Sequence, residues 1–77
     1  MNSRISIDPA VYHGQACIRG TRIPVFQVLG MLASGDSIEQ LLEYYPSLER
    51  DDVLACLDYA ASLAEEQITP LEKAAVV

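Results

Sequence analysis

The chain has few of the residues that perform catalysis or hold metal ions. Its 77 residues include one histidine, His13, two cysteines, Cys17 and Cys56, and no tryptophan. These side chains are too few and too far apart to match a zinc-binding pattern, and no serine or cysteine stands in a recognisable nucleophile arrangement. Gly14 and Gly20 are too far apart to form a phosphate-binding loop. We therefore predict a protein that is not an enzyme and holds no metal or cofactor.

Long apolar runs are also missing. No run approaches the roughly 18 residues that a membrane-spanning helix needs, and the N-terminal stretch MNSRISIDP lacks the apolar segment of a signal peptide. The two cysteines lie in apolar surroundings, which predicts small buried side chains in a reducing compartment. These features predict a cytoplasmic protein with no membrane partner.

Positive charge is scarce, with five basic residues against eleven acidic ones and a net charge of -6. The charges are unevenly distributed. Residues 1–35 carry three arginines against one aspartate (+2), whereas residues 36–77 carry ten carboxylates against Arg50 and Lys73 (-8). Long-range attraction therefore favours a basic partner for the C-terminal part over bare nucleic acid.

The length allows one small domain, which we assign to residues 1–77. A chain of this size buries only about 60% of its unfolded surface, yet 51% of its residues are hydrophobic. An apolar surface that meets another protein or a second copy is therefore expected.

Two short strands are predicted in residues 1–23. Residues 4–7 alternate between polar and apolar side chains and end at Asp8-Pro9, while residues 13–15 suit a turn. Residues 16–18 suit a returning strand that Gly20-Thr21 interrupts. Each strand is too short to be stable alone, so it should pair with the other strand or with a second copy.

Three helices are predicted in residues 24–67, followed by a tail at 68–77. Pro24 suits the first helical position, and Gly35 suits the end of that helix. Ser37 can cap the second helix, which Pro46 ends. The third helix is expected from about Glu49 to Gln67. Its predicted apolar side consists of Val53, Leu57, Ala60 and Ala64, widened by Leu54 and Ala61.

A family resemblance follows from two strings, IDPAVYHGQACIRGTRIPV and SGDSIEQLLEYYP. They resemble the bacterial family numbered 433 among domains of unknown function, over roughly Ile5 to Ala61. The resemblance implies a mainly α fold, a homeodomain-like (helix-turn-helix) three-helix bundle with a short N-terminal β-hairpin. One position departs from the family pattern, because Glu49 stands where a threonine is usual. Glutamate is a poorer helix cap, so Ser47 is an alternative cap for the third helix.

The same resemblance implies a function. Family members are regarded as antitoxins similar to the VapB type, encoded beside a PIN-like ribonuclease toxin. By this resemblance the protein would bind and neutralise its toxin, and repression of its own operon is a further expectation. The alternative is a protein-interaction adaptor that uses the same helices and touches no nucleic acid. A homodimer is the expected assembly in the absence of the toxin.

The segment Arg19-Gly20-Thr21-Arg22 is the first candidate site, with three interpretations. It resembles the basic arm of invertase-type recombinases, which enters the minor groove of DNA. Alternatively it is a structural turn, in which Gly20 supplies an unusual backbone angle, Thr21 a local hydrogen bond, and Arg22 a partner for Asp8. A third interpretation inserts the arginines among the metal-binding carboxylates of the toxin. The sequence leaves all three open.

The start of the third helix argues against direct DNA reading. Arg50 is a candidate for DNA or toxin binding, but Glu49, Asp51 and Asp52 surround it. Such carboxylates repel the phosphates that supply most non-specific affinity for DNA. DNA binding is therefore expected only from a dimer or a toxin complex, through the arm.

The candidate partner interface comprises Tyr44, Glu39, Glu43 and Asp58. Tyr45 is in register with Leu41 and is predicted to lie in the core, so Tyr44 is the better interface anchor. The carboxylates would complement the basic groove of a ribonuclease, although a solvated helix face is the usual explanation for most such residues individually.

Overall fold

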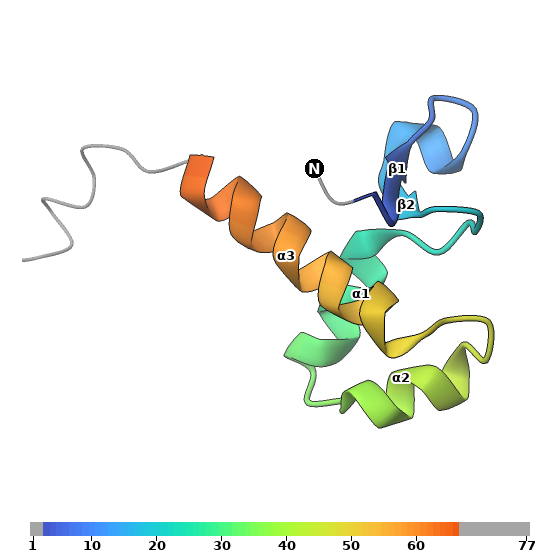
Figure 1. The fold of residues 1–77 in the computed structure, drawn as a ribbon, viewed down its shortest axis with the longest axis vertical. Coiled ribbons are helices and arrows are strands. Elements are labelled where there is room, and N and C mark those ends of the chain that lie inside the picture. Colours follow the sequence, from blue (N-terminus) through green and yellow to red (C-terminus); the bar gives the residue numbers. More distant parts are fainter. Residues whose placement is uncertain (1–2, 67–77) are drawn as a thin grey trace, which may run out of the picture.

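The structure is a computed structural model that describes residues 3–66; Gln67 and the predicted tail at 68–77 lie outside this range. Within residues 3–66 the fold is mainly helical, with three α-helices and one antiparallel hairpin (Figure 1). This confirms the predicted fold class at that level. In chain order the elements are β1 (Ile5–Ile7), the 3-10 turn η1 (Tyr12–Gly14), β2 (Ala16–Ile18), α1 (Val25–Ala33), α2 (Ile38–Tyr44) and α3 (Arg50–Glu66).

The two strands pair with each other within one chain. Ile5 lies opposite Ile18 and Ile7 opposite Ala16 in an antiparallel register. The connection between them contains the turn predicted at residues 13–15, and Gly14 there has a φ of 81°. The hairpin therefore needs no second copy to satisfy its inner edges.

The ends of α1 follow from local chemistry, with one correction. Pro24 precedes the helix in an extended conformation (φ -75°, ψ 145°) and is not its first helical residue. The reason is an isolated β-bridge between Pro24 and Cys17, which keeps this residue extended beside β2. Gly35 ends the helix as predicted, with φ 103°. The Gly35 N–H donates to the carbonyl of Leu32 at 3.0 Å and the Asp36 N–H to that of Met31 at 3.1 Å, a Schellman motif.

A complete capping box begins α2. The Ser37 hydroxyl accepts a hydrogen bond from the Gln40 N–H at 3.1 Å, and the Gln40 side chain accepts one from the Ser37 N–H at 2.7 Å. This arrangement satisfies two N–H groups that a helix start leaves unpaired. The helix ends at Tyr44, two residues before Pro46, so both predicted ends are confirmed.

Both strands and all three α-helices contribute to one core. The hairpin, all three helices and the loop before α3 supply its buried side chains: Ile5, Ile18, Val25, Val28, Leu41, Leu48, Val53, Ala55 and Cys56. The first turns of α3 pack on this core, and its last turns extend beyond the other elements (Figure 1).

The buried face of α3 differs from the predicted one. The structure buries Asp52, Val53, Ala55 and Cys56, whereas Leu54 and Leu57 are 44% and 41% exposed. The helix is rotated about its axis by roughly one residue position, or about 100°, relative to the prediction. Two causes are visible, because small residues allow α3 to approach the core closely and Asp52 is bonded to an arginine near β1.

Candidate functional site

The backbone of the Arg19–Arg22 segment is a turn held by its own hydrogen bonds. Gly20 adopts φ 80°, a conformation that costs glycine little and other residues more. The Thr21 hydroxyl donates to the carbonyl of Ile18 at 2.7 Å and accepts from the N–H of Ile23 at 3.0 Å. The structural interpretation of Gly20 and Thr21 is confirmed, and their predicted role in binding remains a prediction.

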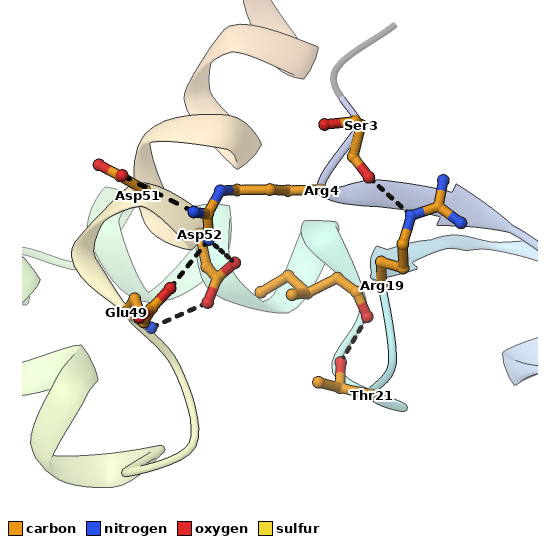
Figure 2. A network of polar contacts seen from close by, with 8 residues as sticks. Ser3, Arg4, Arg19, Thr21, Glu49, Asp51 and Asp52 are labelled. Carbon is orange, nitrogen blue, oxygen red and sulfur yellow. Dashed lines mark hydrogen bonds and ion pairs between the residues drawn. The ribbon is translucent and has the colours of Figure 1, made fainter.

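Arg19 ties this turn to the chain segment that precedes and begins β1. Its Nε donates to the carbonyl oxygen of Ser3 at 2.6 Å (Figure 2), and its Nη2 donates to that of Ile5 at 3.3 Å. The Arg19 N–H also donates to the Arg4 carbonyl at 2.7 Å. The guanidinium group is therefore partly occupied by backbone acceptors, although the residue is exposed at the surface.

Arg22 is exposed and makes no hydrogen bond or ion pair with any residue between 3 and 66. The predicted pairing with Asp8 is wrong. The Asp8 carboxylate instead accepts a hydrogen bond from the Ala10 N–H at 2.9 Å, inside its own turn. Arg22, Arg19 and Asp8 do line the same open pocket of about 690 Å³ beside the hairpin. This pocket holds charges of both signs.

Arg4, which the sequence did not single out, is the centre of a charge cluster at the start of α3. Its Nη1 lies 2.9 Å from Asp52 Oδ1 and 3.1 Å from Glu49 Oε1, and its Nη2 lies 3.7 Å from Asp51 Oδ2 (Figure 2). The hydrogen bonds with Asp52 and Glu49 raise the pKa of the Arg4 guanidinium. We call these four residues the Arg4 cluster. It joins the strand end of the fold to the first turn of α3.

Asp52 has a second role in starting α3. Its other carboxylate oxygen accepts a hydrogen bond from the Glu49 N–H at 2.8 Å, which is one half of a capping box. Ser47, the predicted alternative cap, makes no side-chain hydrogen bond within residues 3–66. The helix therefore begins at Arg50, one residue later than predicted, and a carboxylate in its first turn satisfies the preceding N–H.

The Arg4 cluster reduces the negative charge that the start of α3 presents to a partner. The three carboxylates were expected to face solvent and repel DNA, but the structure gives them a shared cation. A charge asymmetry between the two halves of the chain was visible in the sequence. The pairing partner was not, because Arg4 and Asp52 are 48 residues apart.

Arg50 was predicted to contact DNA or the toxin and Glu39 a partner protein, and in this chain the two residues contact each other. Arg50 Nη1 lies 3.1 Å from Glu39 Oε2, which links α3 to α2. The Glu39 backbone N–H and the Arg50 guanidinium lower the pKa of the Glu39 carboxyl. Both side chains remain largely exposed. Neither is an unpaired charge on the surface of this chain.

At the end of α2, Tyr45 packs on the core and Tyr44 is exposed, as predicted. Tyr45 packs against the core, and its hydroxyl accepts a hydrogen bond from the Gln27 side chain. Tyr44 is 70% exposed and lines a pocket of about 370 Å³ with Glu43. The structure thus brings Tyr44 and Glu43 together on α2, while Asp58 lies on the exposed side of α3.

The excess of hydrophobic residues in the composition appears at the surface. Seven large apolar or aromatic side chains are exposed among the described residues: Ile7, Tyr12, Phe26, Tyr44, Leu54, Leu57 and Leu63. Tyr12 and Phe26 contact each other with ring centroids 5.8 Å apart. Exposed apolar side chains indicate a protein-binding surface only where they form a contiguous patch, and Tyr12 with Phe26 is one pair in contact.

The chemistry of the two thiols is restricted by burial. Cys17 and Cys56 are free and buried, as predicted. Burial, with a smaller contribution from the Asp52 charge, raises the pKa of Cys56 to about 11. Residues 3–66 contain no group of three or more histidine, cysteine or acidic side chains suited to a metal ion. None of the helices between those residues is both long and apolar enough to cross a membrane.

A small helical domain with an N-terminal hairpin and an arginine-containing turn is the class that this structure defines. The family model described as "Protein of unknown function (DUF433)" matches residues 5–60. The chain therefore belongs to the DUF433 family, and the predicted resemblance is confirmed.

Two relatives support this assignment. The uncharacterised protein y4eO of Sinorhizobium fredii (strain NBRC 101917 / NGR234) is 36% identical over 56 residues, which are 73% of this chain. A DUF433 member from Anabaena variabilis, whose crystal structure is known, has 38% sequence identity to this chain. Its structure superposes with a TM-score of 0.76 and covers 82% of this chain. The chain spans only a quarter (25%) of y4eO and 62% of the solved protein.

Proposed function

We propose that this chain is an antitoxin of a type II toxin–antitoxin pair, which binds and neutralises a PIN-like ribonuclease in the cytoplasm. The role in a toxin–antitoxin pair comes from the family resemblance of the two sequence strings. The observation that most directly favours a protein partner over DNA is that most of the arginines already have acceptors within the chain. Of the four in residues 3–66, Arg4 and Arg50 are paired with carboxylates and Arg19 with backbone carbonyls.

This distribution disfavours DNA as the ligand of the isolated chain. Tight DNA binding commonly uses about 6–10 phosphate contacts, and Arg22 is the one arginine without a polar partner in the described range. The exposed side of α3 carries Asp58 and Glu65, which repel phosphates. We therefore do not assign α3 the role of a recognition helix in the free chain. Operon repression, in this proposal, belongs to the toxin complex, in which Arg22 would add to cations of the partner.

An acidic, partly apolar surface suits a ribonuclease partner. A groove that binds RNA is cationic, and complementary charges accelerate association with it and exclude the nucleic acid. In this proposal Tyr44 supplies an aromatic anchor, and Glu43 and Asp58 supply negative charge. Exposed aromatic side chains of this type often dominate binding energy at protein interfaces.

The proposal is tested by producing the chain together with the protein encoded by the adjacent gene. We expect the two proteins to co-purify, growth arrest by the neighbour to be relieved, and its ribonuclease activity to fall as the purified chain is added. Tyr44→Ala should weaken inhibition at least tenfold, whereas His13→Asn, an exposed change in the turn between β1 and β2, should not. If the neighbour neither arrests growth nor binds the chain, the antitoxin proposal is wrong.

The acidic α3 surface also favours the second candidate, a protein-interaction adaptor that touches no nucleic acid. A gel shift with DNA from upstream of the gene separates the two. We expect no shift by the chain alone and a shift by the toxin complex at low salt, which Arg22→Glu should weaken. Arg22→Glu is cleaner than the double change with Arg19→Glu, because Arg19 also holds the hairpin. Absence of a shift under both conditions leaves the adaptor.

A further inference from the structure

The exposed side of α3 carries a regular apolar stripe that the core does not use. It consists of Leu54, Leu57, Ala61 and Ala64, which follow one another at intervals of three, four and three residues. All four are exposed, and at about 100° per residue they form a strip that begins next to Val53 and extends away from Cys56. Alternating intervals of three and four are the pattern by which one helix packs along another. We call these four residues the α3 outer stripe.

The outer stripe has larger apolar side chains than much of the face that α3 buries. The buried and half-buried positions of α3 hold an aspartate, a valine, two alanines, a cysteine and a tyrosine, whereas its three leucines, Leu54, Leu57 and Leu63, are 41–44% exposed. A helix that served only the core would gain by placing its leucines inside, since burying a leucine is favourable by roughly 1.5–3 kcal/mol. The leucines are therefore available to a partner.

A row of carboxylates runs along one edge of the outer stripe. Asp51, Asp58 and Glu65 are seven residues apart, so at about 100° per residue they lie on the same edge of the helix. Asp51 lies near Arg4 at 3.7 Å. Asp58 and Glu65 form no ion pair with any residue between 3 and 66. Two of the three charges thus remain available for a partner.

We propose that the α3 outer stripe binds an amphipathic helix of a partner protein whose apolar seam is flanked by lysine or arginine. This inference rests on the proposed function and specifies it, because the partner is then a basic helix of the toxin. The apolar seam of that helix covers Leu54 and Leu57, and its cations face Asp58 and Glu65. The two alanines let the partner helix approach closely or insert larger side chains near the end of α3.

Charge, more than shape, selects this partner over a second copy of the chain. In an antiparallel pair of α3 helices, the leucines of one copy would fit the alanines of the other. The same pairing would place Asp58 opposite Asp58 and Asp51 opposite Glu65, and like charges at such positions oppose association. The expected homodimer is therefore not assigned to this surface at neutral pH.

The test uses the chain of residues 1–77 and two synthetic peptides with the same leucine seam, one flanked by lysines and one by glutamates. Binding is measured by calorimetry at low and high salt. We expect the lysine peptide to bind at least tenfold more tightly than the glutamate peptide, with the difference decreasing as salt rises. Leu57→Ser should weaken binding at least tenfold. Ile7→Ser, an exposed change of the same kind on the hairpin (51% exposed), should leave it unchanged.

A charge-reversed variant, Asp58→Lys with Glu65→Lys, provides an internal control. This variant should no longer bind the lysine peptide and should bind the glutamate peptide instead. Circular dichroism checks that its fold is unchanged. Equal binding of both peptides, or no effect of Leu57→Ser, overturns the proposal. A dimer at neutral pH that Leu57→Ser dissociates also overturns it, because a second copy then occupies the stripe.

The same variants separate this inference from the antitoxin role. If Leu57→Ser and the double lysine variant still inhibit the ribonuclease as well as the original chain, the outer stripe is not the toxin site although the antitoxin role stands. If the original chain binds the lysine peptide but no neighbouring ribonuclease, the stripe is a docking surface and the antitoxin role fails.

Discussion

Arg4 and Asp52 show how much the surroundings of a single residue decide its role. Both were ordinary charged positions in the sequence, 48 residues apart. Asp52 is 9% exposed and accepts hydrogen bonds from Arg4 and from the Glu49 N–H. Burying a carboxylate to this extent destabilises the fold unless its oxygen atoms accept hydrogen bonds. We therefore expect Asp52 to contribute more to stability than any other acid of the Arg4 cluster.

Replacing Asp52 tests this at the residue scale. Asp52→Ala should lower the free energy of unfolding by roughly 1–3 kcal/mol, because hydrogen bonds to a charged group and a helix start are lost together. Asp52→Asn should cost less, since the amide oxygen can still accept from Glu49. Asp58→Ala, on the exposed side of the same helix, should change stability by no more than about 0.5 kcal/mol. Urea unfolding measures all three, and equal effects at both positions would contradict the role of Asp52.

The raised pKa of Cys56 predicts how the stability of the protein changes at alkaline pH. Its pKa is raised from 9.0 to about 11, so the unfolded chain loses the thiol proton at lower pH than the folded one. The stability that this thiol contributes is therefore complete below about pH 9 and is lost as pH rises through about 11. Between about pH 9 and 11 the original chain should lose stability faster than Cys56→Ala. Parallel pH profiles for the two proteins would contradict the shift.

At the scale of elements, short-range hydrogen bonds explain where the helices start and stop. The capping box of α2 and the Schellman motif of α1 each involve residues within five positions of one another. The contrast between Gly35 and Gly30 shows the same principle. Gly35 ends α1 with a positive φ, whereas Gly30 lies inside the helix.

Alanine at these two glycines should have opposite effects. Gly35→Ala should destabilise the protein by about 1–2 kcal/mol, because a side chain at φ 103° is strained. Gly30→Ala should stabilise it by about 0.5–1 kcal/mol, because alanine is the better helix former. A Cβ at either position meets nothing within 4 Å, so steric clashes do not confuse the comparison. Thermal unfolding of both variants checks the signs.

At the scale of the whole molecule, the net charge of -6 acts on a partner over the longest distance, before the two proteins touch. Complementary long-range charge affects mainly the rate of association and is screened by salt. The ordering of charge within the molecule then decides which surface meets the partner. We expect the partner to bind at the acidic edge of α3, which is exposed.

The salt dependence of association checks this expectation. Stopped-flow measurements with the co-purifying partner should show an association rate that falls about tenfold between 50 and 500 mM salt, with a smaller change in the dissociation rate. Asp58→Asn with Glu65→Gln should reduce that dependence. A rate that does not vary with salt would assign binding to apolar contacts alone.

The sequence alone determined the features that depend on near neighbours. Glycine at positions 20 and 35, the Ser37 cap and the separate fates of Tyr44 and Tyr45 all follow from backbone preference or helical spacing, so they were predicted correctly. The family string was equally local, since it is a run of adjacent residues. Pro24 and the start of α3 were each misplaced by one residue, because contacts with Cys17 and Arg4 influence them.

Only the tertiary structure decided which charges are paired and which side of α3 is buried. Arg4 reaches carboxylates 45 to 48 residues away, and no local pattern predicts such a contact. The apolar residues of α3 occupy more of its surface than the core can cover, so periodicity alone could not choose between Cys56 and Leu57. Packing against the hairpin and α1 made that choice, and it left the leucines at the surface.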